Sequence, residues 1–132
     1  MTRTAVLLAA AAAVAGLTPA AASAHRLEVR ASVVPAAGER PAHLRVEAWY
    51  EYGDPADGAT VTVADAAGTE VGRVTLAADG TGTLPRPPAG PYKVTADDGA
   101  GHRESVRLEV PPSAAEATAA ASAGRSRLLM AA

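Results

Sequence analysis

The chain contains no cysteine and no phenylalanine among its 132 residues. Without cysteine it can form no disulfide, no thiolate metal site and no iron–sulfur cluster, and it has no thiol nucleophile. It also offers no acceptor for a lipid at a signal cleavage site. The composition therefore predicts a domain held together without covalent cross-links.

Aromatic residues are scarce as well, since the chain has one tryptophan and three tyrosines. The core must consequently be built from valine, leucine and alanine, with these few rings as its large pieces. Twelve basic and fourteen acidic residues leave a net charge of −2, and the two signs are interspersed without a basic stripe. We therefore expect no nucleic-acid binding.

The first 24 residues are typical of a secretory signal peptide. Arg3 supplies the positive charge, Ala5–Leu17 is an apolar run too short to span a bilayer, and small residues precede His25. Cleavage after Ala24 would make His25 the first residue of a soluble periplasmic or secreted protein. The alanine-heavy, arginine-rich and lysine-poor composition is typical of a bacterial genome of high GC content.

From His25 to Val110 apolar and polar residues alternate with period two, which is the pattern of half-buried strands. Glycine, proline and aspartate separate the runs and are typical of tight turns. The predicted strands cover residues 27–33, 43–51, 60–64, 71–76, 92–97 and 105–110, with a short seventh piece at 82–84. Strands with one apolar face each must pack as two sheets, so we predict a small antiparallel Ig-like or prealbumin-like β-sandwich over residues 25–110.

Residues 111–132 form an alanine-rich, low-complexity segment that follows two prolines. Alanine favours helix, but the segment has almost no apolar periodicity, so we predict a tail that is disordered or transiently helical. Its Leu128-Leu129-Met130 cluster is too short to anchor in a bilayer. The mature chain is thus predicted to have no membrane span.

Histidine supplies the candidate metal ligands. A free α-amino group and the imidazole of the same residue can close a chelate ring on a transition metal, so cleavage after Ala24 would make His25 a bidentate ligand. His102 stands in a glycine-rich loop before the last predicted strand. If the first and last strands run parallel side by side, their starts bring His25 and His102 together, and both share the parity of core-facing residues.

Two further groups have alternative interpretations. Glu47 could add an oxygen ligand to the metal, or it could be a solvated charge on a polar strand face. The aromatic cluster Trp49–Tyr52 could form a binding ledge, or divide into one core ring and others that cover sheet edges. His43 is interpreted as a solvated surface residue.

No serine lies in a nucleophile elbow and no catalytic triad is apparent, so we expect no enzyme activity.

Part of the chain resembles the prealbumin-like repeat of carboxypeptidase regulatory-like domains. The matching motifs are Gly58-Ala59-x-Val61-x-Val63-x-Asp65-x-x-Gly68, Asp79-Gly80-x-Gly82 and Pro88-x-Gly90-x-Tyr92-x-Val94. This resemblance implies a fold and not a function.

A narrower resemblance spans His25 to Val110. The chain is similar to the small exported accessory proteins of nickel and cobalt uptake transporters of the energy-coupling-factor type. The motifs that carry it are Ala24-His25-Arg26-Leu27-x-Val29, Val46-Glu47-Ala48-Trp49, the hairpin from Gly53-Asp54-Pro55 to Gly68, Asp79-Gly80-x-Gly82 and Gly99-Ala100-Gly101-His102-Arg103-Glu104-Ser105. The resemblance implies a metal role for His25 and His102 and a membrane transporter as partner.

The sequence thus predicts a non-catalytic periplasmic protein that binds nickel or cobalt for uptake, through His25, His102 and, as a third ligand, Glu47. Two alternatives remain at this point. The domain could be a structural or interaction module of an exported protein, without metal, that uses an edge strand or the Trp49–Tyr52 cluster. It could also be a periplasmic copper carrier with the same chelate, because copper outcompetes nickel at most nitrogen sites.

Overall fold

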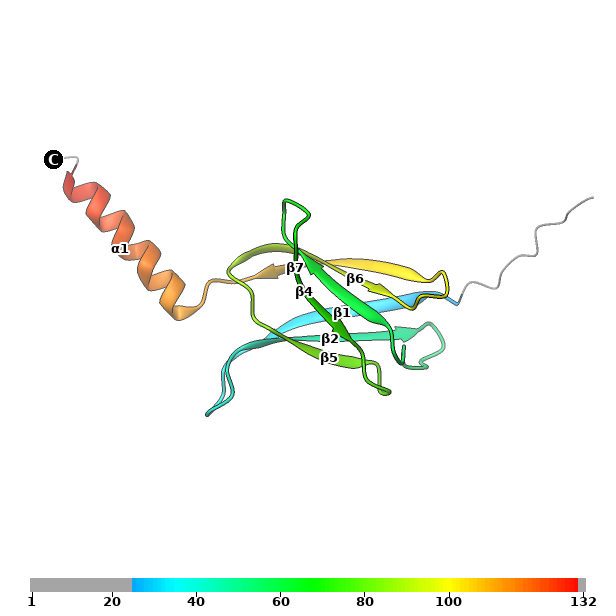
Figure 1. Cartoon of the computed structure of the whole chain (residues 1–132). Coiled ribbons are helices and arrows are strands. Elements are labelled where there is room, and N and C mark those ends of the chain that lie inside the picture. The colour runs from blue at the N-terminus through cyan, green and yellow to red at the C-terminus, as the bar shows by residue number, and fades with distance from the viewer. Residues whose placement is uncertain (1–24, 131–132) are drawn as a thin grey trace, which may run out of the picture.

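The computed structural model describes residues 25–130, and the predicted signal peptide at residues 1–24 lies outside this range. Within these described residues, seven strands are followed by one helix, in chain order (Figure 1). The elements are β1 (Leu27–Val34), β2 (His43–Tyr50), β3 (Thr60–Ala64), β4 (Glu70–Thr75), β5 (Thr81–Pro85), β6 (Gly90–Asp97), β7 (Arg103–Val110) and α1 (Ala114–Met130).

The strands form two sheets, one of three strands in the order β1-β2-β5 and one of four in the order β4-β3-β6-β7. Every pairing between neighbouring strands within a sheet is antiparallel. The predicted antiparallel β-sandwich is therefore confirmed, including the short strand around residues 82–84. The physical reason is the period-two pattern, which gives each strand one apolar face that only a second sheet can cover.

The core lies between the inner faces of the two sheets and consists almost entirely of aliphatic side chains. Its largest fully buried members are Leu44, Val46, Val61, Val63 and Val94. Tyr92 is the one aromatic ring among the buried residues, and its hydroxyl donates a hydrogen bond to the carbonyl of Pro88 at 2.6 Å. The core thus has the composition expected of a chain without phenylalanine.

The first and last strands belong to different sheets but pack beside each other along one side of the sandwich. In Figure 1 β1 and β7 run in the same direction and begin at the same end of the molecule. This arrangement is the condition under which the sequence predicts that His25 and His102 approach each other.

The alanine-rich segment forms helix α1, where the sequence pattern predicts a disordered or transiently helical tail. Ser113 and Glu116 make a reciprocal capping box: the Ser113 hydroxyl accepts from the Glu116 amide at 3.1 Å, and the Glu116 carboxylate accepts from the Ser113 amide at 2.8 Å. Glu116 also accepts from Arg86 at 3.3 Å. The high helix propensity of alanine and this cap favour a helix even though the segment has no apolar face. The helix extends away from the sheets (Figure 1).

We expect Val46→Ala to lower the free energy of unfolding by about 2 kcal/mol, because it removes two methyl groups from a side chain that is 0% exposed. Val71→Ala is the matched control. Val71 is 48% exposed, so its truncation should change stability by less than about 0.5 kcal/mol. Urea unfolding followed by circular dichroism measures both, and equal losses would contradict the described core.

The helix cap gives a second prediction. Ser113→Ala should weaken the start of α1 by about 1 kcal/mol and lower the helical circular dichroism signal near 222 nm, because the Glu116 amide loses its acceptor. Ser122→Ala, inside the same helix, should leave that signal unchanged or raise it. A signal that is insensitive to Ser113→Ala would show that the cap does not hold the helix.

Candidate metal site

His25 and His102 line the same hollow at the end of the sandwich where β1 and β7 begin. His25 lies two positions before the first residue of β1, and His102 directly precedes β7. The hollow has a volume of about 310 Å³, and its other lining residues are Tyr50, Tyr52, Asp54, Asp98 and Ala100. The structure therefore brings together the two histidines that the sequence singles out.

The loop between β6 and β7 fixes the position of His102 through Asp98. The Asp98 Oδ1 atom accepts hydrogen bonds from the backbone amides of Ala100 at 2.8 Å and His102 at 3.1 Å. Gly99 and Gly101 have positive φ angles of 73° and 101°, which glycine adopts without strain. These two glycines allow the chain to turn tightly around one carboxylate.

The second oxygen of Asp98 contacts two side chains that come from different sheets. Nδ1 of His102 lies 2.5 Å from Oδ2, and the hydroxyl of Tyr50 donates to the same oxygen at 2.8 Å. Tyr50 ends β2 in the three-stranded sheet, whereas His102 precedes β7 in the four-stranded sheet. The carboxylate therefore connects the two sheets beside the hollow, and its side chain is only 7% exposed.

This environment keeps Asp98 ionised. Burial acts to raise the pKa of the Asp98 carboxyl, but hydrogen bonds from the Ala100 amide, the Tyr50 hydroxyl and His102 outweigh burial and hold that pKa well below its usual range. The hydrogen bond to Asp98, with smaller contributions from burial and the carboxylate charge, raises the pKa of Tyr50. Tyr50 thus stays protonated and donates to a carboxylate that can only accept.

The ionised carboxylate also determines which nitrogen of neutral His102 carries the proton. Nδ1 must donate to Asp98, so Nε2 keeps its lone pair. Metal-binding histidines commonly have this arrangement, in which a carboxylate accepts from one ring nitrogen and the other nitrogen binds the metal. The chemistry of His102 is therefore that of a preoriented nitrogen ligand.

A tyrosine ring stands edge-on to each histidine. Tyr50 and His102 have ring centroids 5.8 Å apart at an interplanar angle of 81°, and His25 and Tyr52 have centroids 5.5 Å apart at 74°. The aromatic cluster of residues 49–52 does not form one ledge, because Trp49 and Tyr50 point to opposite faces of β2. Trp49 instead lies under the guanidinium of Arg30, which is 5.4 Å from its ring centroid.

Glu47 does not line the hollow with the two histidines. Its strand neighbours Val46 and Ala48 are buried in the core, so Glu47 projects from the outer face of β2 and binds the Arg45 guanidinium at 2.7 Å. His43 lies at the opposite end of β2 from Tyr50, with Nδ1 3.2 Å from the carbonyl of Pro41. Neither residue is placed to join His25 and His102.

Within residues 25–130, no three histidine, aspartate or glutamate side chains stand in a group that could hold a metal ion by themselves. Of the residues that line the hollow, His25 and His102 offer ring nitrogens, and Asp54 and Asp98 carry carboxylates. Sequence reasoning singled out Tyr50 and Tyr52 only as members of the aromatic cluster, and it missed Asp54 and Asp98 as residues of the hollow. Asp98 does give a local signal, since it precedes His102 by four residues in a glycine loop.

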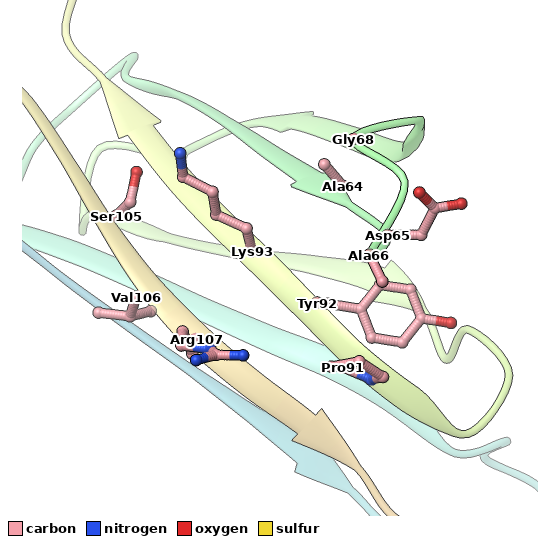
Figure 2. Close-up of a pocket in the computed structure, with 10 residues that line it drawn as sticks. All are labelled: Ala64, Asp65, Ala66, Gly68, Pro91, Tyr92, Lys93, Ser105, Val106 and Arg107. Atoms are coloured by element: carbon pink, nitrogen blue, oxygen red, sulfur yellow. The ribbon is translucent and has the colours of Figure 1, made fainter.

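A second hollow lies on the outer face of the four-stranded sheet, beside the β3–β4 hairpin (Figure 2). Its volume is about 460 Å³, and Lys93 and Arg107 line it from directly opposed positions on β6 and β7. Neither cation forms a salt bridge within the described residues. Figure 2 shows the Asp65 carboxylate turned away from them, and that carboxylate accepts from the backbone amides of Ala67 and Thr69.

No family model, no curated protein and no solved structure matches this chain. Among the described residues, no helix has the length and apolar character needed to cross a bilayer.

Asp98→Asn should lower the free energy of unfolding at pH 7 by about 2 kcal/mol, because four hydrogen bonds to a buried charge are weakened. The pKa of Asp98 is lower in the folded state than in the unfolded chain, where it is about 4. The Asp98 charge therefore stabilises the folded wild type above pH about 4, and this stabilisation is lost as the pH falls below that value. The asparagine variant should lack this acid dependence.

Asp97→Asn is the matched control, because the Asp97 side chain is 44% exposed and lies 3.9 Å from Arg103. Urea titrations between pH 7 and pH 2.5 measure the three proteins. If Asp98→Asn retains the acid dependence of the wild type, the assigned network is wrong.

Proposed function

We propose that this protein is a non-catalytic, periplasmic accessory protein that binds a divalent transition metal, nickel or cobalt, for uptake. The observation that carries the proposal is that His25 and His102 line one hollow in which Asp98 leaves Nε2 of His102 as a free nitrogen ligand. Imidazole nitrogen suits nickel, cobalt, copper and zinc and does not suit calcium or magnesium. The metal is cargo in this proposal and not a catalytic cofactor.

His25 supplies the remaining nitrogen donors in the proposed site. If the signal peptide is cleaved after Ala24, the α-amino group and the imidazole of His25 together close a chelate ring on the metal. His25 is exposed at the start of β1, so a metal can reach it from solvent. Glu47 is left out of this site, because it projects from the outer face of β2 and is engaged by Arg45.

The choice of nickel or cobalt, and of a membrane uptake transporter as partner, follows from the resemblance of the His25 and His102 motifs to the accessory proteins of such transporters. A copper carrier would use the same nitrogen ligands and would bind its metal more tightly. The ligand types therefore do not distinguish a nickel or cobalt protein from a copper carrier, and the metal that the periplasm supplies decides between them.

A second candidate function is an interaction module that acts without metal. The observation in its favour is the hollow of Figure 2, where Lys93 and Arg107 occupy directly opposed positions on β6 and β7 and have no acidic salt-bridge partner among the described residues. Like charges in directly opposed positions are unfavourable in a sheet, and an acidic segment of another protein would neutralise them. This candidate predicts binding that does not depend on His25.

Calorimetric titration of Ni²⁺ into two preparations of the chain tests the proposed function. One begins at His25 with a free amine, and the other carries an acetyl group on that amine. We expect one-to-one binding by the first and an affinity at least about tenfold lower for the second, because an amide nitrogen replaces the amine. Equal or absent binding in both preparations would favour the interaction module.

Two variants of the chain that begins at His25 sharpen this test. His25→Ala should weaken Ni²⁺ binding at least about tenfold, whereas His43→Ala should not, because His43 lies at the other end of β2. Binding should also weaken as the pH falls, since the amine and both imidazoles must lose their protons before they bind metal. Equal affinities for the two alanine variants would remove His25 from the site.

A further inference from the structure

The edge strands of the sandwich are not equally protected against pairing with another chain. β1 and β7 are the edges on one side, and they pack beside each other. On the opposite side β5 ends at Pro85, and Pro87 and Pro88 follow, so prolines remove amide donors from this end of the edge. Strand β4 is the remaining edge. It contains no proline, and within residues 25–130 it pairs only with β3.

A β-bulge turns Val71 out of the ladder near the start of β4. The register between β3 and β4 shifts between Val63 and Ala64, so Val71 has no partner on β3. Val71 is also one of two large hydrophobic residues that are exposed among those the structure describes. From Gly72 to Thr75 the register with β3 is regular, so the bulge leaves the rest of this edge able to pair.

An apolar hollow lies directly beside Val71. Val71 and Gly72 line it from β4, Leu84 lines it from β5, and its volume is about 180 Å³. Among the lining residues Arg86 alone is charged, and Glu116 and two backbone carbonyls already bind its guanidinium. Gly72 has no side chain to fill the hollow. The hollow therefore suits an apolar side chain that comes from another strand.

The charges on β4 are self-complementary. Glu70 and Arg73 flank Val71 and Gly72, and the Arg73 guanidinium donates hydrogen bonds of 2.6 and 3.1 Å to the Glu70 carboxylate. The two charges cancel, so β4 does not repel a second copy of itself. In an antiparallel pair of β4 strands with a twofold axis between Val71 and Gly72, each Glu70 faces the Arg73 of the other copy. The partner that fits this pattern is a second copy of the chain.

We propose that two copies of this chain associate by antiparallel pairing of their β4 strands. The pairing joins the two four-stranded sheets into one continuous sheet, and it inserts Val71 of each copy into the apolar hollow of the other. A twofold contact of this kind is closed, so it forms a dimer and not a filament. β4 and β7 are opposite edges of the sheet, so the hollow of His25 and His102 stays open in the dimer. The dimer does not depend on metal binding.

Sedimentation equilibrium of the chain that begins at His25, without metal, tests this dimer. We expect one reversible step from monomer to dimer as the protein concentration rises. Glu70→Arg and Arg73→Glu should each weaken the dimer at least about tenfold, because like charges then face each other across the twofold axis. An equal mixture of the two variants should restore the dimer, since every facing pair in the mixed dimer has opposite charges. Restoration would also show that both variants are folded.

Arg45 and Glu47 provide the matched control. Their side chains form an ion pair of 2.7 Å on the outer face of β2, a strand that has neighbours on both sides. Arg45→Glu and Glu47→Arg should therefore leave the dimer dissociation constant unchanged, whether the variants are measured alone or mixed.

Val71→Ala isolates the apolar contact. It should weaken the dimer about tenfold, because two methyl groups of each copy no longer fill the hollow of the other. Dimerisation as strong as that of the parent chain would overturn the insertion of Val71.

The remaining outcomes decide the pairing itself. A chain that stays monomeric at every concentration overturns the proposal, and so does a dimer that is insensitive to Glu70→Arg and Arg73→Glu, because it must use another surface. A mixture no more dimeric than either variant alone overturns the twofold pairing of β4. The nickel titration measures the proposed function separately, so either result can fail while the other holds.

Discussion

The carboxylate of Asp98 is the single group on which the geometry of the site depends. It binds the Tyr50 hydroxyl from one sheet, the His102 ring from the edge of the other, and the backbone of its own loop. A buried carboxylate without these donors would be costly, so the loop, the tyrosine and the histidine are held in one arrangement. The same bonds that stabilise the charge also orient His102. Structure and proposed chemistry therefore share one network, and neither can change without the other.

The core explains why this network lies where it does. Its small aliphatic side chains allow the two sheets to pack with β1 beside β7, so the starts of both strands meet at one end of the sandwich. Tyr50 points to the same inner face of β2 as Val46 and Ala48. It is the last residue of β2, however, and there the hollow replaces the aliphatic core. Its ring can therefore pack against His102 while its hydroxyl reaches a polar partner, which is the usual requirement of a tyrosine at the margin of a core.

The period-two pattern predicts the seven-stranded sandwich correctly because each strand has one apolar face and clear turn residues at its ends. The alternation of inward and outward positions along a strand also places His25 and His102 on inward faces. It places Glu47, which stands between the inward Val46 and Ala48, on the outward face and away from the hollow. The bond between Tyr50 and Asp98 joins residues 48 apart in sequence, and no local pattern reports such a contact. Helix α1 differs, because its signal is local: the capping box joins Ser113 and Glu116, only three residues apart. A search for apolar periodicity does not detect a capping box.

The two histidines of the hollow differ in how firmly they are held. His102 is fixed through its ring, its amide and its loop, whereas His25 is exposed and its ring meets only the edge of Tyr52 among the described aromatic rings. In the proposed function, the accessible His25 would capture the metal and the fixed His102 would seat it. Release would follow the same route in reverse, because loss of His25 would leave a single imidazole on the metal. Such asymmetry suits a protein that hands its cargo on, and a fully enclosed set of four protein ligands would not allow it as readily.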